Sequence, residues 1–157
     1  MSQSLASTDL DERLRFFTEA CRERGLKMTP QRLEIFRELA STLWHPSVED
    51  VHQRIRTRLP NVSLDTVYRT LATLQEHGII NRVEALDDRA RYDANLTRHH
   101  HFVCTRCQKV EDVVWPALDS VPLPDGAAHL GDIDRVYAEI RGICRSCLEE
   151  AEATADD

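Results

Sequence analysis

The stretch SLDTVYRTLATLQEHGIINRV occupies residues 63–83, and it decides the fold of the first half of the chain. Ser63 is a favourable N-cap, and Gly78 suits the position just after a helix ends. Between them, apolar residues recur at the spacing of one helix face. The residues of that face are Leu64, Val67, Leu71 and Leu74. The stretch therefore predicts a helix with a polar outer face, followed by a strand that begins at Ile79.

The residues on either side extend this pattern. Thr8, Thr29 and Ser47 are candidate caps of three earlier helices. A pair of strands at residues 79–92 flanks the acidic turn Asp87-Asp88. Helices followed by a hairpin predict a winged helix-turn-helix, in which the last helix enters the major groove of DNA.

The outer face of that last helix supplies candidate DNA contacts. Arginine bonds guanine edges or phosphate, and threonine suits phosphate or thymine. The alternative interpretation is a small helical bundle whose polar residues form a solvated face. The candidate DNA-contacting residues are Thr66, Arg69 and Thr70, which are expected to face outward, Tyr68 at the edge of that face, and Arg32 outside this helix.

Composition limits the other possibilities. The chain has 157 residues, of which 41% are hydrophobic and 30% charged, a balance typical of a soluble folded protein. The net charge is −7, yet residues 1–92 carry 14 basic and 14 acidic residues, so the excess acid lies beyond them. The apolar runs are too short to span a bilayer, and the first residues lack the pattern of a secretory signal. We therefore expect a cytoplasmic protein without a membrane partner.

Four of the five cysteines form two matched pairs, Cys104-x-x-Cys107 and Cys144-x-x-Cys147, separated by 36 residues. Each pair closes a tight turn, and two pairs complete the tetrahedral sulfur cage that structural zinc prefers. The alternatives are redox-active pairs or buried thiols. Because a reducing compartment disfavours structural disulfides, the pattern favours zinc.

A second candidate metal site lies in the run RHHHFVC, residues 98–104. Strand periodicity sends His99 and His101 to one face and His100 to the other. Two such imidazoles can chelate one ion, and the nearby acidic residues Asp93, Glu111 and Asp112 are candidate oxygen ligands. A mixed nitrogen and oxygen set suits Fe(II), Mn(II) or Zn(II), whereas the alternative is a solvated histidine run.

Six segments together resemble the ferric uptake regulator family, over roughly residues 10–150, and are most similar to its peroxide-responsive repressors. They are LKMTPQRLEIFREL (26–39), WHPSVEDVH (44–52), the stretch 63–83, RYDAN (91–95), RHHHFVCTRCQKVEDV (98–113) and IRGICRSC (140–147). The resemblance implies an α+β protein with two domains. These are a winged-helix DNA-binding domain at 1–92, and a small α/β dimerisation domain with the tetrathiolate zinc site at 93–157.

The resemblance also implies the regulatory ligands, an Fe(II) or Mn(II) ion, and a homodimer that binds double-stranded operator DNA. The regulatory ligands are His45, Asp93, His99, His101 and Asp112. Peroxide-responsive relatives lose DNA when ligand histidines are oxidised, which makes His45 and His99 the expected targets.

Three alternatives remain at this point. The first is an iron-uptake repressor, whose family members typically carry glutamates where Asp93 and Asp112 stand. The second is a zinc- or manganese-sensing member of the same family. The third is a zinc enzyme such as a nucleobase deaminase, which needs His-x-Glu and Pro-Cys-x-x-Cys. Because neither motif is present, we expect no enzymatic activity.

Overall fold

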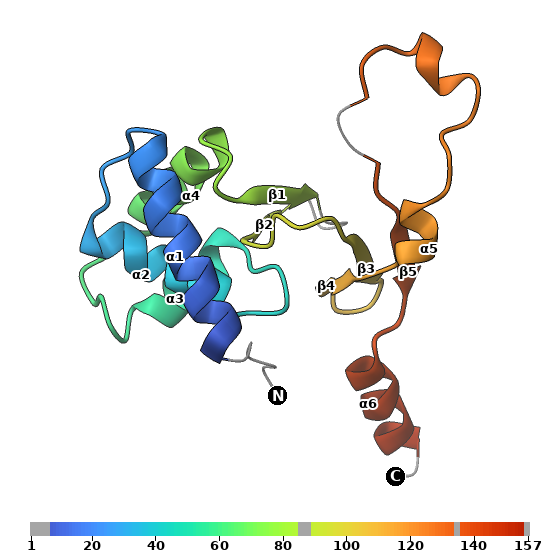
Figure 1. Ribbon diagram of the computed structural model, residues 1–157. Helices are drawn as coiled ribbons and strands as arrows, with labels where there is room; N and C mark the ends of the chain where they lie inside the picture. Colours follow the sequence, from blue (N-terminus) through green and yellow to red (C-terminus); the bar gives the residue numbers. More distant parts are fainter. Residues whose placement is uncertain (1–6, 85–88, 134–135, 156–157) are drawn as a thin grey trace. The chain divides into compact units, whose positions relative to one another are not determined.

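The computed structural model describes residues 7–84, 89–133 and 136–155. The chain divides into two compact units, Met1–Thr97 and Arg98–Asp157 (Figure 1). The sequence placed the domain boundary after residue 92, at the end of the hairpin. Within the described residues, no helix is long and apolar enough to cross a membrane.

The first unit contains four helices and a two-stranded hairpin. The helices are α1 (Ser7–Glu23), α2 (Pro30–Ala40), α3 (Val48–Ile55) and α4 (Leu64–Glu76). The strands β1 (Asn81–Glu84) and β2 (Ala90–Asp93) pair antiparallel, with Asn81 opposite Asp93. The predicted turn Asp87-Asp88 lies outside the described residues. This arrangement is the predicted winged helix-turn-helix.

Local capping explains where three of these helices begin. The Thr29 hydroxyl accepts a hydrogen bond from the Arg32 backbone N–H, and Pro30 follows at the first helical position. Ser47 and Asp50 form a reciprocal capping box on α3. Ser63 caps α4 in the same way as Thr29 caps α2. The prediction of Thr8 as a cap is wrong, because α1 already includes that residue.

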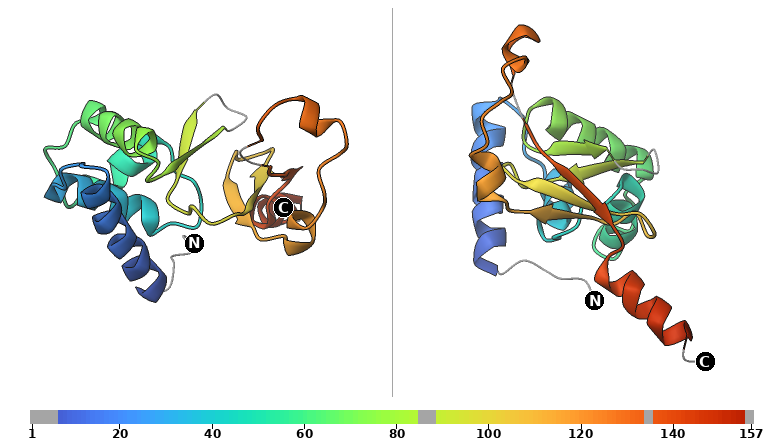
Figure 2. Two further views of the ribbon diagram at one scale, coloured as in Figure 1. Left: turned by 45° about the horizontal axis from the view of Figure 1, so that its top comes forward. Right: turned by 90° about the vertical axis from the view of Figure 1, so that its right-hand side faces the viewer.

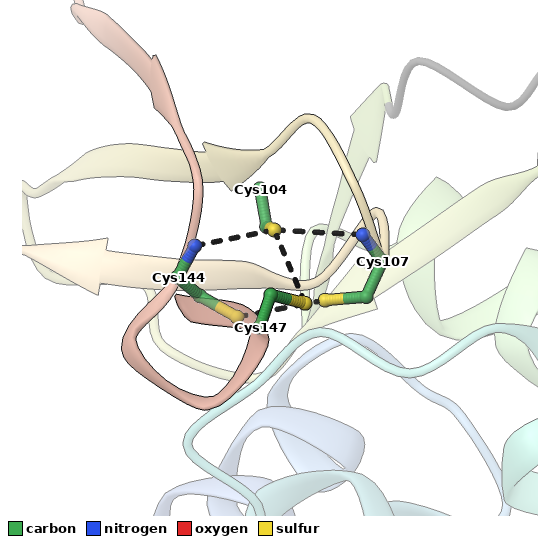
Figure 3. Close-up of side chains that lie close together, drawn as sticks. All are labelled: Cys104, Cys107, Cys144 and Cys147. Carbon is green, nitrogen blue, oxygen red and sulfur yellow. Dashed lines mark hydrogen bonds between the residues drawn. The ribbon is translucent and has the colours of Figure 1, made fainter. Parts of the chain in front are cut away.

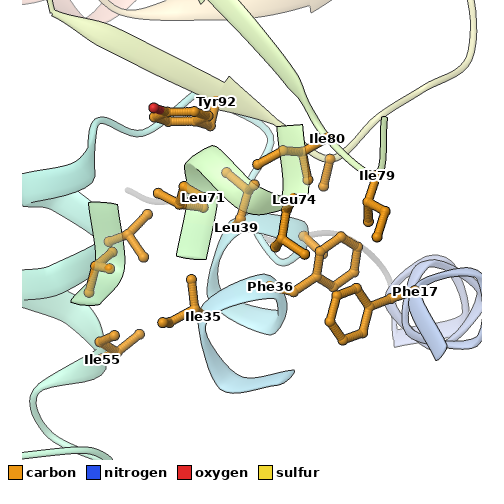
Figure 4. Packing of buried hydrophobic residues seen from close by; sticks show 14 of the residues in the cluster. Phe17, Ile35, Phe36, Leu39, Ile55, Leu71, Leu74, Ile79, Ile80 and Tyr92 are labelled. Atoms are coloured by element: carbon orange, nitrogen blue, oxygen red, sulfur yellow. The ribbon is translucent and has the colours of Figure 1, made fainter. Parts of the chain in front are cut away.

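The core of the first unit lies among its helices (Figure 4). Phe17 of α1 stacks on Phe36 of α2 with ring centroids 4.3 Å apart. Helix α4 adds Val67, Leu71 and Leu74, all completely buried. Burial of each such side chain contributes about 1.5–3 kcal/mol, so this stripe holds α4 against the other helices.

Two orientations on α4 differ from the prediction. Thr70 is only 8% exposed and shares the inward stripe with Val67 and Leu71, so its predicted outward orientation is wrong. Leu64 is 42% exposed, although it was assigned to the core. Because Leu64 is the first residue of the helix, it precedes the turns that pack on α2 and α3, and the stripe begins at Val67 instead.

The second unit contains a three-stranded sheet in the order β4-β3-β5 (Figure 2). The central strand β3 (His100–Cys104) pairs antiparallel with β4 (Val110–Val113) and parallel with β5 (Glu139–Gly142). The short helix α5 (Pro116–Asp119) and the 3-10 turn η1 (Ala127–His129) lie in the connection from β4 to β5. Helix α6 (Arg145–Ala155) follows β5.

Two features of this unit differ from what the sequence predicts. The pattern VYAEIRGI at residues 136–143 predicts a strand, but only Glu139–Gly142 pairs with β3. The sequence pattern predicts neither α5 nor η1. The acidic, alanine-rich tail from Glu149 predicts either a frayed helix or a disordered end, and the structure has a helix that runs from Arg145 through Ala155.

Candidate metal centres

The four paired cysteines meet at one end of the small sheet (Figure 3). Cys104 ends β3, Cys107 lies in the turn that follows, and Cys144 and Cys147 lie at the start of α6. The Cys104 and Cys147 sulfurs are 4.0 Å apart, and those of Cys107 and Cys144 are 3.7 Å apart. All four are free thiols whose sulfurs lie within 4.8 Å of one another.

These distances fit zinc. Zinc–sulfur bonds of about 2.3 Å in a tetrahedron place neighbouring sulfurs about 3.8 Å apart. A disulfide would instead bring two sulfurs to about 2.0 Å. The tetrathiolate set therefore fits a closed structural zinc site, as the spacing predicted.

The environment of Cys104 favours a thiolate ligand. Burial raises the pKa of this thiol, but backbone N–H groups that donate to its sulfur outweigh burial and lower the pKa to about 6. Two of these donors are the amides of Cys107, at 3.5 Å, and Cys144, at 3.3 Å. Each donor stabilises the anionic form, which is the form that binds metal.

The cysteines also form a buried cluster of the second unit. Cys104, Cys144 and Cys147 are buried together, with Phe102 packed against them. A unit this small buries little apolar surface, so its stability depends on additional cross-links. Metal binding at such a site contributes directly to the free energy of folding.

A nitrogen and oxygen set lies on the same strands. His101 of β3 pairs directly with Asp112 of β4, which puts their side chains on one face of the sheet. The Nε2 atoms of His99 and His101 are 3.0 Å apart, and His99 Nε2 is 3.4 Å from Asp112 Oδ1. Donors of a six-coordinate ion, with bonds of about 2.1 Å at right angles, have a similar separation of about 3 Å.

The alternative acid, Glu111, does not join this set. It lies opposite Phe102 in the β3–β4 register, on the other face of the sheet from Asp112, and pairs with Lys109. The register therefore distinguishes two adjacent carboxylates that spacing alone left open.

The first unit holds a second pair of candidate ligands. His45 Nδ1 is 3.7 Å from Asp93 Oδ1, and both side chains are 4% exposed. Strand β2 holds the segment that carries His45, because the Tyr92 N–H donates to the Pro46 carbonyl at 3.1 Å and the Arg91 side chain donates to the His45 carbonyl. Each unit thus brings imidazole and carboxylate groups together, a donor chemistry that fits Fe(II) or Mn(II).

The predicted DNA contacts lie on or near α4 with different exposures. Tyr68 is 55% exposed, and the Arg69 side chain is 77% exposed and pairs with Asp65 at 2.9 Å. Thr66 is half-buried, and its hydroxyl lies 2.8 Å from that of Ser63 at the helix start. Arg32 of α2 is half-buried and donates to the Lys27 carbonyl, whereas the buried Thr70 offers no surface for DNA.

The fifth cysteine lies apart from both donor sets. Cys21 is 1% exposed on α1 and packs in the core of the first unit. Burial raises the pKa of this thiol, which keeps it protonated and unreactive at neutral pH.

Comparisons with known proteins establish the family of the chain. The model of the ferric uptake regulator family matches residues 23–123. The peroxide-responsive repressor PerR of Staphylococcus epidermidis is 34% identical over 152 residues, which are 96% of this chain and 99% of that protein. The chain belongs to the ferric uptake regulator family. Within this family, it is similar to the peroxide-responsive repressors.

Solved structures show the same fold. The Helicobacter pylori ferric uptake regulator matches with a TM-score of 0.68 at 23% identity, over 93% of this chain and 97% of that chain. A zinc uptake regulator, solved in complex with zinc and DNA, matches with a TM-score of 0.64 at 26% identity, over 91% and 97%. Membership of the ferric uptake regulator family and the two kinds of donor set support a metal-responsive repressor.

Proposed function

We propose that this member of the ferric uptake regulator family is a cytoplasmic, dimeric repressor that senses peroxide. It binds operator DNA when Fe(II) or Mn(II) occupies the regulatory site, and it releases DNA when the iron form reacts with peroxide. The observation that carries this proposal is the 34% identity to PerR of Staphylococcus epidermidis along nearly the whole chain. The aspartates at 93 and 112, where iron-uptake members typically carry glutamates, support the same branch.

The regulatory ion is proposed to bind five ligands contributed by both units. The first unit supplies His45 and Asp93, and the second supplies His99, His101 and Asp112. An ion bound by both units would fix the angle between them, and so the spacing of the two reading helices in a dimer.

The five proposed ligands would leave room for peroxide beside a bound ion, and this is the proposed basis of peroxide sensing. Bound Fe(II) supplies the reducing chemistry that activates hydrogen peroxide beside its own ligands. A ligand imidazole then gains one oxygen atom, and the other oxygen of the peroxide leaves as water. His45 and His99 are the proposed targets, and an oxidised imidazole is a poorer ligand, so the ion is lost.

Dimerisation is proposed to use the second unit. Strand β5 lies at one edge of the sheet, and an edge strand presents backbone groups to which a second copy can pair. Large apolar side chains are exposed in the same unit, which is typical of an interface. They include Val114, Trp115, Val121, Leu123, Leu130 and Tyr137. DNA is proposed to contact the exposed face of α4, through Thr66, Tyr68 and Arg69, with Arg32 nearby.

The test is operator binding as a function of Mn(II). His45→Ala removes one proposed ligand and leaves the four cysteines intact. We expect weaker metal-dependent operator binding, with zinc content and dimerisation unchanged. His77→Ala is the matched control. His77 belongs to the same unit as His45, its side chain is half-buried, and it is the C-cap residue of α4. If the His45→Ala protein shows the same Mn(II) dependence of operator binding and the same operator affinity as the unaltered protein, the proposed five-ligand site is wrong.

A further inference from the structure

His100 is the histidine of the run 99–101 that neither donor set uses. Its side chain is 1% exposed, on the face of β3 opposite His101. His100 Nδ1 accepts a hydrogen bond from the Ala138 backbone N–H at 3.0 Å. The ring therefore carries its proton on Nε2 and donates it to Asp119 Oδ1, 3.1 Å away. The His100 and Trp115 rings lie nearly perpendicular to one another, with centroids 6.5 Å apart.

Asp119 receives a second donor at the same oxygen. Arg98 Nε lies 2.7 Å from Asp119 Oδ1, a short charge-assisted contact. Arg98 and His100 are the residues immediately before and after His99. One carboxylate at the end of α5 thus holds both chain neighbours of a proposed metal ligand.

His99 lies immediately before strand β3, which begins at His100. The position of its ring therefore depends on how its two chain neighbours are fixed. His101, in contrast, is held directly, since its N–H donates to the Ala138 carbonyl at 3.1 Å and it pairs with Asp112. Arg98 and His100 both reach Asp119, whereas His99 Nε2 lies near His101 Nε2 and Asp112 Oδ1.

From this geometry we infer that Asp119 is a positioning residue for the regulatory metal site, holding His99 in place through Arg98 and His100. The inference rests on the proposed function, since it takes His99 as a ligand. Asp119 is not proposed to contact the ion itself. Its hydrogen-bond partners are the guanidinium of Arg98 and the imidazole N–H of His100. Orienting groups of this kind contribute about 10- to 100-fold to metal affinity.

The test is a Mn(II) titration of the zinc-loaded full-length protein, with free Mn(II) measured by electron paramagnetic resonance. Asp119→Ala is expected to weaken Mn(II) binding about 10- to 100-fold. Zinc content should stay as in the unaltered protein and thermal unfolding should stay cooperative, which separates positioning from loss of the fold. Asp119→Asn retains an acceptor for both donors and is expected to recover part of the affinity. Asp125→Ala, an exposed aspartate in the same β4–β5 connection, is the matched control and should have no effect.

His99→Ala distinguishes failure of the inference from failure of the proposed site. Unaltered Mn(II) affinity in Asp119→Ala, together with lost affinity in His99→Ala, would overturn the inference alone. Unaltered affinity in His99→Ala would overturn both. Should Asp119→Ala lose zinc, Arg98→Gln decides, because the Arg98 side chain is 54% exposed and its replacement disturbs folding little. Weaker Mn(II) binding in Arg98→Gln supports the inference, and unaltered binding contradicts it.

Discussion

Gln108 shows how the first cysteine turn is constrained at the scale of one residue. Its φ is 63°, in the left-handed region that glycine adopts freely and other residues rarely do. The turn imposes this conformation, because the Gln108 N–H donates to the Cys104 carbonyl at 2.9 Å. The left-handed conformation costs a non-glycine residue roughly 1–2 kcal/mol.

This strain predicts a ranking of variants at position 108. Gln108→Gly removes the strain but loses the side-chain hydrogen bond to the Thr105 carbonyl, so we expect stability equal to or up to about 1 kcal/mol above that of the unaltered protein. Gln108→Val places a β-branched residue at positive φ and should destabilise the protein by more than about 1 kcal/mol. Thermal unfolding of the zinc-loaded protein measures both. A Gln108→Val protein that is more stable than the Gln108→Gly protein would contradict the assignment of backbone strain to position 108.

Residue spacing predicted much of the two donor sets, but not the choice among neighbouring acids. The Cys-x-x-Cys pairs and the alternation of His99 and His101 are local patterns, and the structure places those side chains as expected. Spacing did not separate Asp112 from Glu111; the family resemblance selected Asp112, and the β3–β4 register puts Asp112, not Glu111, opposite His101. Asp119 was missed because its partners lie 19 and 21 residues earlier, across the sheet connection.

At the scale of an element, α4 has two faces. Its inner face packs in the core of the first unit, and its outer face is proposed to bind DNA. Thr70 packs inward, whereas Arg69 is exposed on the other side. Thr70→Val should therefore keep both stability and operator affinity, since valine has a similar shape. Arg69→Ala and Tyr68→Ala should weaken operator binding with Mn(II) affinity unchanged.

Fluorescence anisotropy with labelled operator DNA measures this contrast at fixed salt. For Arg69→Ala we expect a loss of about 1–3 kcal/mol if it contacts a base, and a smaller salt dependence if it contacts phosphate. Equal losses in Thr70→Val and Arg69→Ala would mean that the inward and outward faces of α4 are misassigned.

The elements themselves were predictable where their signals are local. Caps at Thr29, Ser47 and Ser63 mark helix starts because each hydroxyl accepts a hydrogen bond from the amide three residues ahead. The pattern at residues 136–143 overestimates strand β5, because the length of this strand depends on parallel pairing with β3, whose paired residues lie 38 positions earlier in the chain. Leu64 was assigned to the core because its apolar character fits the stripe, although the first turn of α4 lies outside the packed region.

At the scale of the whole molecule, the cysteine cage is expected to stabilise the second unit. Cys104→Ser removes a ligand whose sulfur is completely buried. Structural zinc sites contribute on the order of 10 kcal/mol, so the variant should lose zinc, its sharp thermal transition and the dimer. Cys21→Ser is the control, because that cysteine lies in the other unit and should leave zinc content unchanged.

Zinc content by metal analysis and mass by analytical ultracentrifugation test this expectation together. A Cys104→Ser protein that remains dimeric and melts cooperatively without zinc would contradict the structural assignment.

The central claim is that peroxide acts through the ligands of the iron form, and one paired measurement tests it most directly. The Fe(II) and Mn(II) forms receive the same brief peroxide dose, followed by peptide mass spectrometry and operator binding. The account predicts one added oxygen on His45 and His99 of the Fe(II) form, with lost DNA binding, and an unmodified Mn(II) form that still binds. Equal survival of both forms, with His45 and His99 unmodified, would contradict peroxide sensing and favour an iron-uptake repressor.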